Sequence, residues 1–123
     1  MLFDIIKDKS FSQMMENHLK EMVTYLLQSG ETFSILCKID LVSFSPELPK
    51  QIQKELRSMT LFFLAGYTLE STRLDNDKLI FEAGFGTENF GSIVTVPLLS
   101  IVQILLEETP AFVNLALPKE ILS

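Results

Sequence analysis

Cysteine and histidine, on which much catalytic and metal chemistry depends, are nearly absent from this sequence. Cys37 is the only cysteine and His18 the only histidine among 123 residues. A single cysteine excludes an intramolecular disulfide and fits a reducing compartment. No Cys, Asp or Glu accompanies His18 at the spacing of a metal site, and no charge near Cys37 would lower its pKa. We therefore expect a packing or interface histidine and a structural, buried cysteine.

The sequence also lacks a long apolar run and a targeting signal. No run approaches the roughly 18 residues that a membrane-spanning helix needs. The first ten residues, MLFDIIKDKS, carry Asp4 inside their apolar stretch and have neither a basic start nor a small-residue cleavage site. We expect a cytoplasmic protein that does not enter a membrane.

Basic residues are scarce and scattered. Ten Lys and Arg against 16 Asp and Glu give a formal net charge of −6. No basic stripe carries interleaved aromatic residues. Because phosphate neutralisation dominates nucleic-acid affinity, this charge argues against nucleic acid as a partner. An RNA-binding small barrel stays open as a weak alternative.

The chain is rich in apolar residues. Ten Phe and an apolar fraction of 47% are typical of a well-packed globular protein. The length fits a single domain over residues 1–123 and is enough to bury a core without metals or disulfides.

The first half of the chain gives clear secondary-structure signals. Apolar residues recur at helical spacing over residues 10–28, with a capping box from Ser10 to Gln13 and a stop at Gly30. Residues 32–44 alternate as a strand with one buried face. A short helical turn is expected in KQIQKEL (50–56), and a dense apolar strand in MTLFFLAGY (59–67).

The second half is expected to be mainly antiparallel. TLESTRL (68–74) is interpreted as a polar-faced strand, paired through the turn at residues 75–77 with KLIFEAGF (78–85). A glycine-rich loop, GFGTENFG (84–91), leads into the strand SIVTV (92–96). Pro97 favours a helix over LLSIVQILLEE, and FVNLAL (112–117) a last strand. Hairpin connections without a strand–helix alternation indicate the α+β class.

No constellation in the sequence supports catalysis. Glu107 and Glu108 are adjacent, and adjacent side chains on a helix diverge, so they cannot share a catalytic site. The stretch GFGTENFG lacks the Lys-Ser/Thr ending of a phosphate loop and precedes a strand. It fits either a flexible hairpin loop or the rim of a groove. We expect a binding protein, without enzyme activity, metal or cofactor.

The stretch NDKLIFEAGFG, followed by IVTVPLLSIVQIL, resembles the SspB family, adaptors that deliver ssrA-tagged polypeptides to the ClpXP protease. The family frame is an acidic or polar turn, a strand ending in Phe-Gly, a loop, and a strand ending in Val-Pro. The residues that fill it are Asp77, Phe81, Phe85, Gly86, Val94, Val96 and Pro97. Upstream, the amphipathic helix, the alternating strand and Met59-Thr60-Leu61 extend the likeness to nearly the whole chain, from about Phe11 to Leu117.

The resemblance implies a fold, a site and partners. The fold would be an N-terminal helix on two small antiparallel sheets forming a partial barrel. A groove between the sheets would bind an extended peptide by backbone pairing. The peptide-binding residues carried over are Phe63, Leu64, Ala65 and Gly66 on one strand and Glu82, Ala83, Gly84 and Phe85 across from it. The resemblance also implies a homodimer, to which the helix over residues 10–28 contributes, tagged polypeptides as ligands and the ClpX unfoldase as partner.

Two departures from the family qualify these expectations. Family members carry Phe-Gly-Gly-hydrophobic-Pro at the loop, whereas here Phe85-Gly86 leads into Thr87-Glu88-Asn89-Phe90-Gly91, so peptide preference is expected to differ. Family adaptors also carry a linker and a ClpX-docking tail, for which LPKEILS is too short. We therefore expect this chain to bind tagged substrates without stimulating their degradation. The alternative is a non-catalytic assembly or partner-binding protein unconnected to proteolysis.

Overall fold

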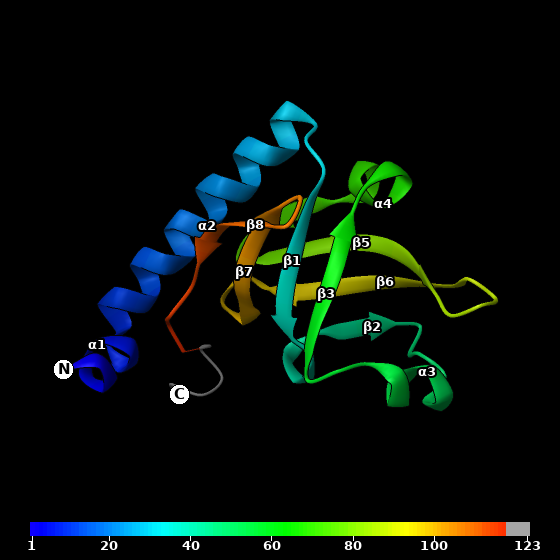
Figure 1. The fold of residues 1–123 in the computed structure, drawn as a ribbon, viewed down its shortest axis with the longest axis horizontal. Helices are drawn as coiled ribbons and strands as arrows, with labels where there is room; N and C mark the ends of the chain where they lie inside the picture. The colour runs from blue at the N-terminus through cyan, green and yellow to red at the C-terminus, as the bar shows by residue number, and fades with distance from the viewer. Residues whose placement is uncertain (118–123) are drawn as a thin grey trace.

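The computed structural model describes residues 1–117, and the chain begins with two helices (Figure 1). Helix α1 (Leu2–Lys7) leads into the long helix α2 (Lys9–Ser29), which the apolar periodicity predicted. Gly30 ends α2 with φ 72°, a left-handed conformation that glycine adopts without steric cost. The predicted capping box is wrong: the Asp8 carboxylate caps α2 by accepting a hydrogen bond from the Ser10 N–H at 2.9 Å.

The residues that follow form two four-stranded antiparallel sheets. The first, in the order β3-β1-β7-β8, contains β1 (Phe33–Lys38), β3 (Met59–Leu64), β7 (Ile101–Leu106) and β8 (Thr109–Val113). The second, in the order β2-β6-β5-β4, contains β2 (Ser43–Ser45), β4 (Arg73–Asp75), β5 (Lys78–Phe85) and β6 (Phe90–Pro97). The α+β class, with an N-terminal helix and two small antiparallel sheets, is confirmed.

Short 3₁₀ turns carry the chain from one sheet to the other. η1 (Ile39–Leu41) joins β1 to β2, and η2 (Leu98–Ser100) joins β6 to β7. In Figure 1 the strands of the first sheet cross those of the second, as in orthogonal packings whose corners are made where the chain switches sheets. Two short helices, α3 (Lys50–Glu55) and α4 (Gly66–Ser71), flank β3 in the chain.

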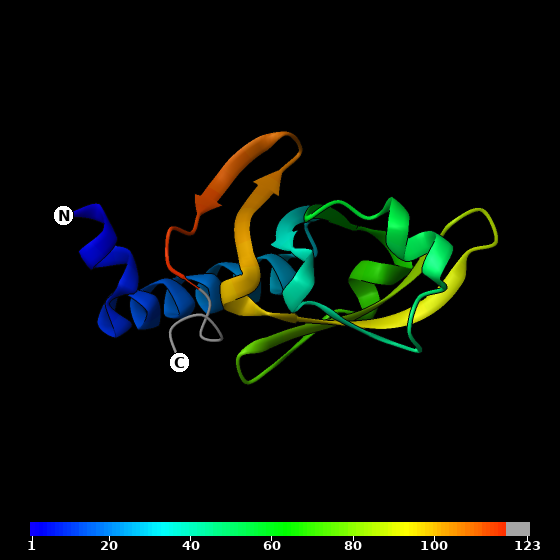
Figure 2. The ribbon, with the colours of Figure 1, turned by 90° about the horizontal axis from the view of Figure 1, so that it is seen from below.

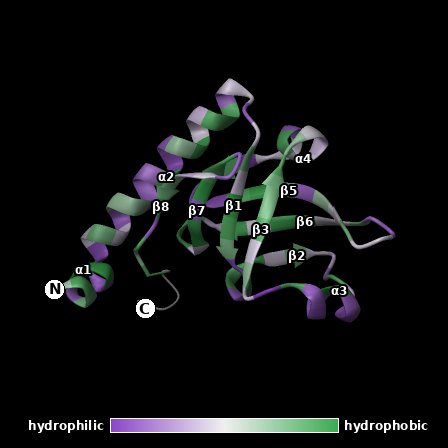
Figure 3. Ribbon diagram, viewed as in Figure 1, coloured by the Kyte–Doolittle hydropathy of each residue, from purple (hydrophilic) through white to green (hydrophobic). Residues whose placement is uncertain are grey.

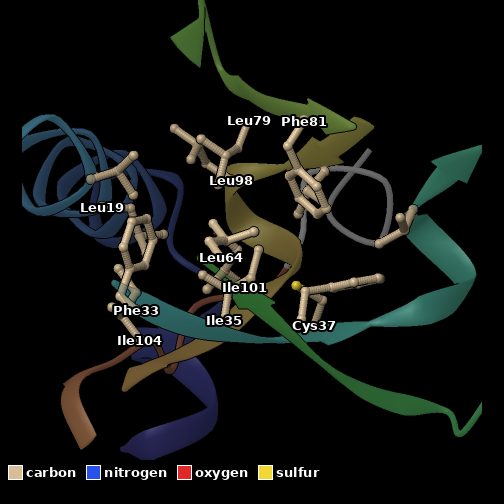
Figure 4. Close-up of a cluster of buried hydrophobic side chains, with 14 of the residues drawn as sticks. Leu19, Phe33, Ile35, Cys37, Leu64, Leu79, Phe81, Leu98, Ile101 and Ile104 are labelled. Atoms are coloured by element: carbon tan, nitrogen blue, oxygen red, sulfur yellow. The ribbon is translucent and has the colours of Figure 1, made fainter. Parts of the chain in front are cut away.

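The core lies between the two sheets and α2. Leu19 from α2, Phe33 from β1 and Phe81 from β5 are all at most 1% exposed, and Figure 4 shows them within one cluster. Apolar residues concentrate on the strands in Figure 3, while α3 is hydrophilic. Each fully buried leucine or phenylalanine side chain of this core stabilises the fold by about 1.5–3 kcal/mol, because it is removed from water. The inward register predicted for Cys37 is also confirmed, because its side chain is fully buried.

The two ends of the long axis carry different elements. Figures 1 and 2 both place the N-terminus and α1 at one end and the turn of the β5–β6 hairpin at the other. Within the described chain no helix has both the length and the apolarity of a membrane span. Residues 118–123, on which the expectation about a short linker rests, lie outside the described residues.

The predicted helix after Pro97 is wrong. Only the 3₁₀ turn η2 follows Pro97, and the chain then extends as β7. β7 lies between β1 and β8, so both of its edges are paired, and its continuous apolar run is that of a central strand. Glu107, which was expected at a helix end, instead occupies the two-residue turn between β7 and β8 with φ 58°.

The predicted strand over residues 68–74 is also wrong in its first part. Residues Gly66–Ser71 form the helix α4, and only Arg73–Asp75 pair with β5. The expected strand over residues 32–44 is interrupted by η1, and the final strand ends at Val113. The hairpin around residues 75–77 is confirmed, as is the strand before the glycine-rich loop.

Candidate peptide-binding groove

A groove of about 480 Å³ lies beside helix α4 and the β5–β6 hairpin. Its walls come from α4, from β5 and β6, and from the segment that follows β2 (Figure 1). The lining residues are Ser45, Pro46, Tyr67, Thr68, Glu82, Ala83, Gly84, Asn89, Gly91, Ser92 and Ile93.

The α4 wall is fixed to the sheet by hydroxyl groups. Ser71 Oγ accepts a hydrogen bond from the Glu82 N–H at 2.9 Å and donates to the Thr68 carbonyl at 2.7 Å. Thr72 Oγ1 donates to the same carbonyl at 2.7 Å. Gly66, with φ 55°, lets the chain turn from β3 into this helix. The short helix α4 therefore occupies the side of β5 where a strand would otherwise run.

This arrangement leaves part of β5 without a strand neighbour. β4 pairs with β5 only from Lys78 to Ile80, and no other strand of the described chain lies on that side of β5. Backbone hydrogen-bonding groups of a strand alternate in direction from residue to residue. Because the Glu82 N–H faces α4, the backbone N–H and carbonyl of Gly84 face the same edge. An unpaired strand edge of this kind accepts an added strand.

The floor of the groove is nearly bare backbone. Gly84 and Gly91 are opposite each other in the β5–β6 ladder. A Cβ on Gly91 would meet no atom within 4 Å, whereas a Cβ on Gly84 would collide with the Asn89 side-chain amide. The Asn89 side chain therefore lies over Gly84. The Asn89 backbone has φ 54°, a left-handed conformation in which asparagine is enriched.

The charged group of the groove is the Glu82 carboxylate, which is hydrogen-bonded to the phenol of Tyr67. The Tyr67 hydroxyl donates a hydrogen bond to Glu82 Oε1 at 3.1 Å, and both side chains are exposed. The pKa of the Tyr67 hydroxyl is raised above its ordinary value, and this hydrogen bond is the largest cause. The charge of Glu82, desolvation and the charge of Glu70 follow in decreasing order. No Lys or Arg lines the groove.

On the opposite rim, the buried side chain of Ser92 holds the segment after β2. Its Oγ donates a hydrogen bond to the Pro46 carbonyl at 2.9 Å, and the Ser45–Pro46 peptide bond is cis. The Ile93 side chain, directly across from Glu82 in the ladder, is 43% exposed. The groove thus has one acidic wall and one apolar wall.

The structure brings together only part of the predicted site. Glu82, Ala83 and Gly84 line the groove, although the Ala83 side chain packs toward the core. Phe85 faces the interior, with its ring centroid 5.6 Å from that of Phe44, and lines a separate hollow of about 530 Å³ beside α3.

The four residues predicted on the other strand do not line the groove. Their strand, β3, lies in the first sheet, whereas β5 lies in the second. Phe63 is 65% exposed and Leu64 fully buried, so the one lies at the surface and the other in the core. Ala65 is the N-cap of α4 and Gly66 its first residue.

Sequence reasoning missed the residues supplied by α4 and by the hairpin turn. Tyr67 and Thr68 were assigned to strands rather than to a helix, although Gly66 signalled a break. Asn89 was placed in a loop that the structure shows as a tight turn, with Phe85 and Phe90 paired at its base. The asparagine itself was the available signal for a left-handed residue at this turn.

The other candidate residues do not converge on a site. Burial raises the pKa of the Cys37 thiol far above its ordinary value, which keeps it protonated and inert. His18 is exposed on α2, with its ring centroid 6.3 Å from that of Phe112. Across residues 1–117, no group of three or more His, Cys, Asp or Glu side chains is arranged to hold a metal ion.

Comparisons with known proteins add no relative. No protein-family model matches the sequence, and neither does any curated protein.

Proposed function

We propose that this protein is a peptide-binding adaptor that recognises degradation-tagged, ssrA-type polypeptides for ClpXP proteolysis. The observation that carries the proposal is the groove beside β5, onto which the backbone of Gly84 opens without a strand neighbour. An extended peptide gains affinity there from main-chain hydrogen bonds and specificity from pockets for alternate side chains. The tag and the protease come from the resemblance to the SspB family.

The groove suits binding better than catalysis. Its lining offers one carboxylate, one amide, hydroxyl groups, apolar side chains and backbone, and it contains no histidine, cysteine or lysine. A nucleophile with a neighbouring general base is the usual requirement of hydrolytic chemistry. We therefore propose a role in recognition, without enzyme activity.

The proposal extends to assembly and location. We propose a cytoplasmic homodimer that presents tagged polypeptides to the ClpX unfoldase. Most of the apolar stripe of α2 packs on the protein's own core, so the helix offers less to a partner than its sequence indicated. Exposed large apolar residues gather on α1 and early in α2, namely Leu2, Phe3, Ile5 and Met14, while Tyr25 is exposed near the other end of α2. Helix α1 is at the end of the molecule opposite the hairpin turn (Figures 1 and 2), so pairing there would leave the groove open.

One observation favours the alternative, an assembly or partner-binding protein unconnected to proteolysis. Leu61 and Phe63 on the edge strand β3 are 57% and 65% exposed. Apolar side chains on an unpaired edge are a typical contact surface for another chain. Under this alternative, no tagged peptide would bind in the groove.

The test is fluorescence anisotropy with a labelled ssrA-type peptide. We expect saturable binding, which Gly91→Leu abolishes because its side chain fills the open floor of the groove. Thr95→Leu is the matched control, since Thr95 lies on the same strand and face but outside the lining residues. A folded Gly91→Leu variant that binds as tightly as the wild type would contradict the proposal.

A further inference from the structure

Resting on the proposed peptide-binding function, we propose that the groove selects peptides that place a lysine or arginine side chain against Glu82. Glu82 and Tyr67 would form the polar end of this subsite, and Ile93 its apolar side.

The charge of the groove is one-sided. Glu82 is the one formally charged residue among those that line it. Glu70 on the same α4 wall adds a second negative charge in the surroundings of Tyr67. A cationic side chain is attracted into this field, while an acidic one is repelled.

Glu82 retains capacity to bind a cation. Its Oε1 accepts the hydroxyl proton of Tyr67 at 3.1 Å, whereas an ionised carboxylate has about four acceptor positions on its two oxygens. Within residues 1–117, the salt bridges join Met1 to Asp4 and Lys20 to Glu16, and Glu82 takes part in neither. The phenol therefore orients the carboxylate without neutralising it.

The surroundings of Glu82 fit the stem of a long basic side chain. Ile93 stands directly across the β5–β6 ladder from Glu82 and is 43% exposed. Tyr67, 65% exposed, presents its ring on the α4 side of the same groove. Lysine and arginine cover apolar surface with their methylene groups while the charged end stays near polar groups, and a cation also gains from an aromatic face.

Other ligands fit this end of the groove less well. A metal ion needs several converging ligands, and in the described chain Glu82 belongs to no such group. A free carboxylate, as at the C-terminus of a peptide, would face Glu82 without a counter-charge. The subsite therefore binds the side chain of an internal basic residue in an extended peptide.

The experiment compares matched labelled peptides by fluorescence anisotropy. An ssrA-type peptide is made in sets that carry Lys, Ala or Glu at one position, and that position is moved along the peptide. At one register we expect the Lys peptide to bind about three- to tenfold more tightly than the Glu peptide, the range of a solvent-exposed ion pair gained and a repulsion removed.

Variants of the protein assign that preference to Glu82. Glu82→Gln should remove the Lys preference, and Glu82→Lys should invert it in favour of the Glu peptide. Glu108→Gln, the same charge change in the distant β7–β8 turn, should leave it intact. Far-UV circular dichroism checks that each variant is folded.

The outcomes separate this inference from the function on which it rests. Peptides that bind without a Lys preference at any register, or with one that survives Glu82→Gln, overturn the cationic subsite and leave peptide binding standing. Failure of every peptide to bind overturns the proposed function and this inference together.

Discussion

Ser71 Oγ accepts a hydrogen bond from the backbone N–H of Glu82 at 2.9 Å, so a side chain takes the place that a strand carbonyl would have at this edge of β5. The same hydroxyl donates to the Thr68 carbonyl, within the last turn of α4. This double use of one hydroxyl sets the distance between α4 and the sheet, and with it the width of the groove.

Ser71→Ala should therefore loosen the α4 wall. We expect the free energy of unfolding to fall by about 1 kcal/mol, the contribution of a typical hydrogen bond, and peptide affinity to fall several-fold. Ser71→Thr keeps the hydroxyl and should restore most of both quantities. Urea unfolding and peptide anisotropy measure them. Equal peptide affinity of the Ala variant and the wild type would show that α4 does not shape the site.

Asn89 should be replaceable only by a residue that tolerates φ 54°. Asn89→Val is expected to destabilise the protein by at least about 1 kcal/mol, because a β-branched residue is strained in the left-handed region, whereas Asn89→Gly should be nearly neutral. Asn76→Val, in the turn after β4 with φ 59°, should lose similar stability while peptide binding is retained. If Asn76→Val weakens peptide binding as much as Asn89→Val does, the weaker binding comes from the general loss of stability and not from a change local to the groove.

Phe62 and Phe63 are adjacent in sequence and should behave oppositely. Phe62 is 6% exposed and packs edge-on against Phe81, with ring centroids 5.5 Å apart. Phe62→Ala should cost about 3–5 kcal/mol of unfolding free energy. Phe63→Ala should cost less than about 1 kcal/mol and leave peptide affinity unchanged, since the structure places Phe63 on the sheet opposite to the groove. A lost peptide affinity in folded Phe63→Ala would restore the sequence-based assignment of this residue.

The proposed homodimer has a direct test. Light scattering should give a mass of about twice 14.0 kDa at tens of micromolar. Phe3→Asp places a charge among the exposed apolar residues of α1 and should shift the mass to the monomer value, while Tyr25→Asp, at an exposed position near the other end of α2, should not. A monomer in a folded wild-type sample would count against the dimer.

Burial of Cys37 should make the free energy of unfolding fall at alkaline pH. Desolvation raises the pKa of its thiol in the folded protein, so only the unfolded chain releases the proton once the pH exceeds the ordinary thiol pKa of about 8.5. The contribution is fully present below that pH and is lost as the pH rises above it. Urea unfolding at pH 7 and pH 9.5 should therefore show a larger loss for the wild type than for Cys37→Ala. Equal losses would mean that the thiol ionises alike in both states.

The sequence by itself determined the elements whose pattern has one interpretation. The helical spacing of Leu19, Val23 and Leu26 specified α2, because only a helix places these side chains on one face. The alternation of Phe33, Ile35 and Cys37 specified β1 in the same way, since a strand repeats every two residues. The hairpin at residues 75–77 followed from local turn chemistry.

Only the tertiary structure decided the elements whose local pattern is ambiguous. The apolar run after Pro97 suits a helix or a buried strand equally, and it became β7 because β1 and β8 supply hydrogen-bond partners on both of its edges. Residues 68–71 are helical in the structure, where Ser71 bonds to Glu82 of β5, 11 residues further along the chain. The groove depends on the second of these decisions, because α4 forms one of its walls beside β5. Three of the eight predicted residues, Glu82, Ala83 and Gly84, line the groove, and its other walls are set by which segments meet in space, which no local pattern encodes.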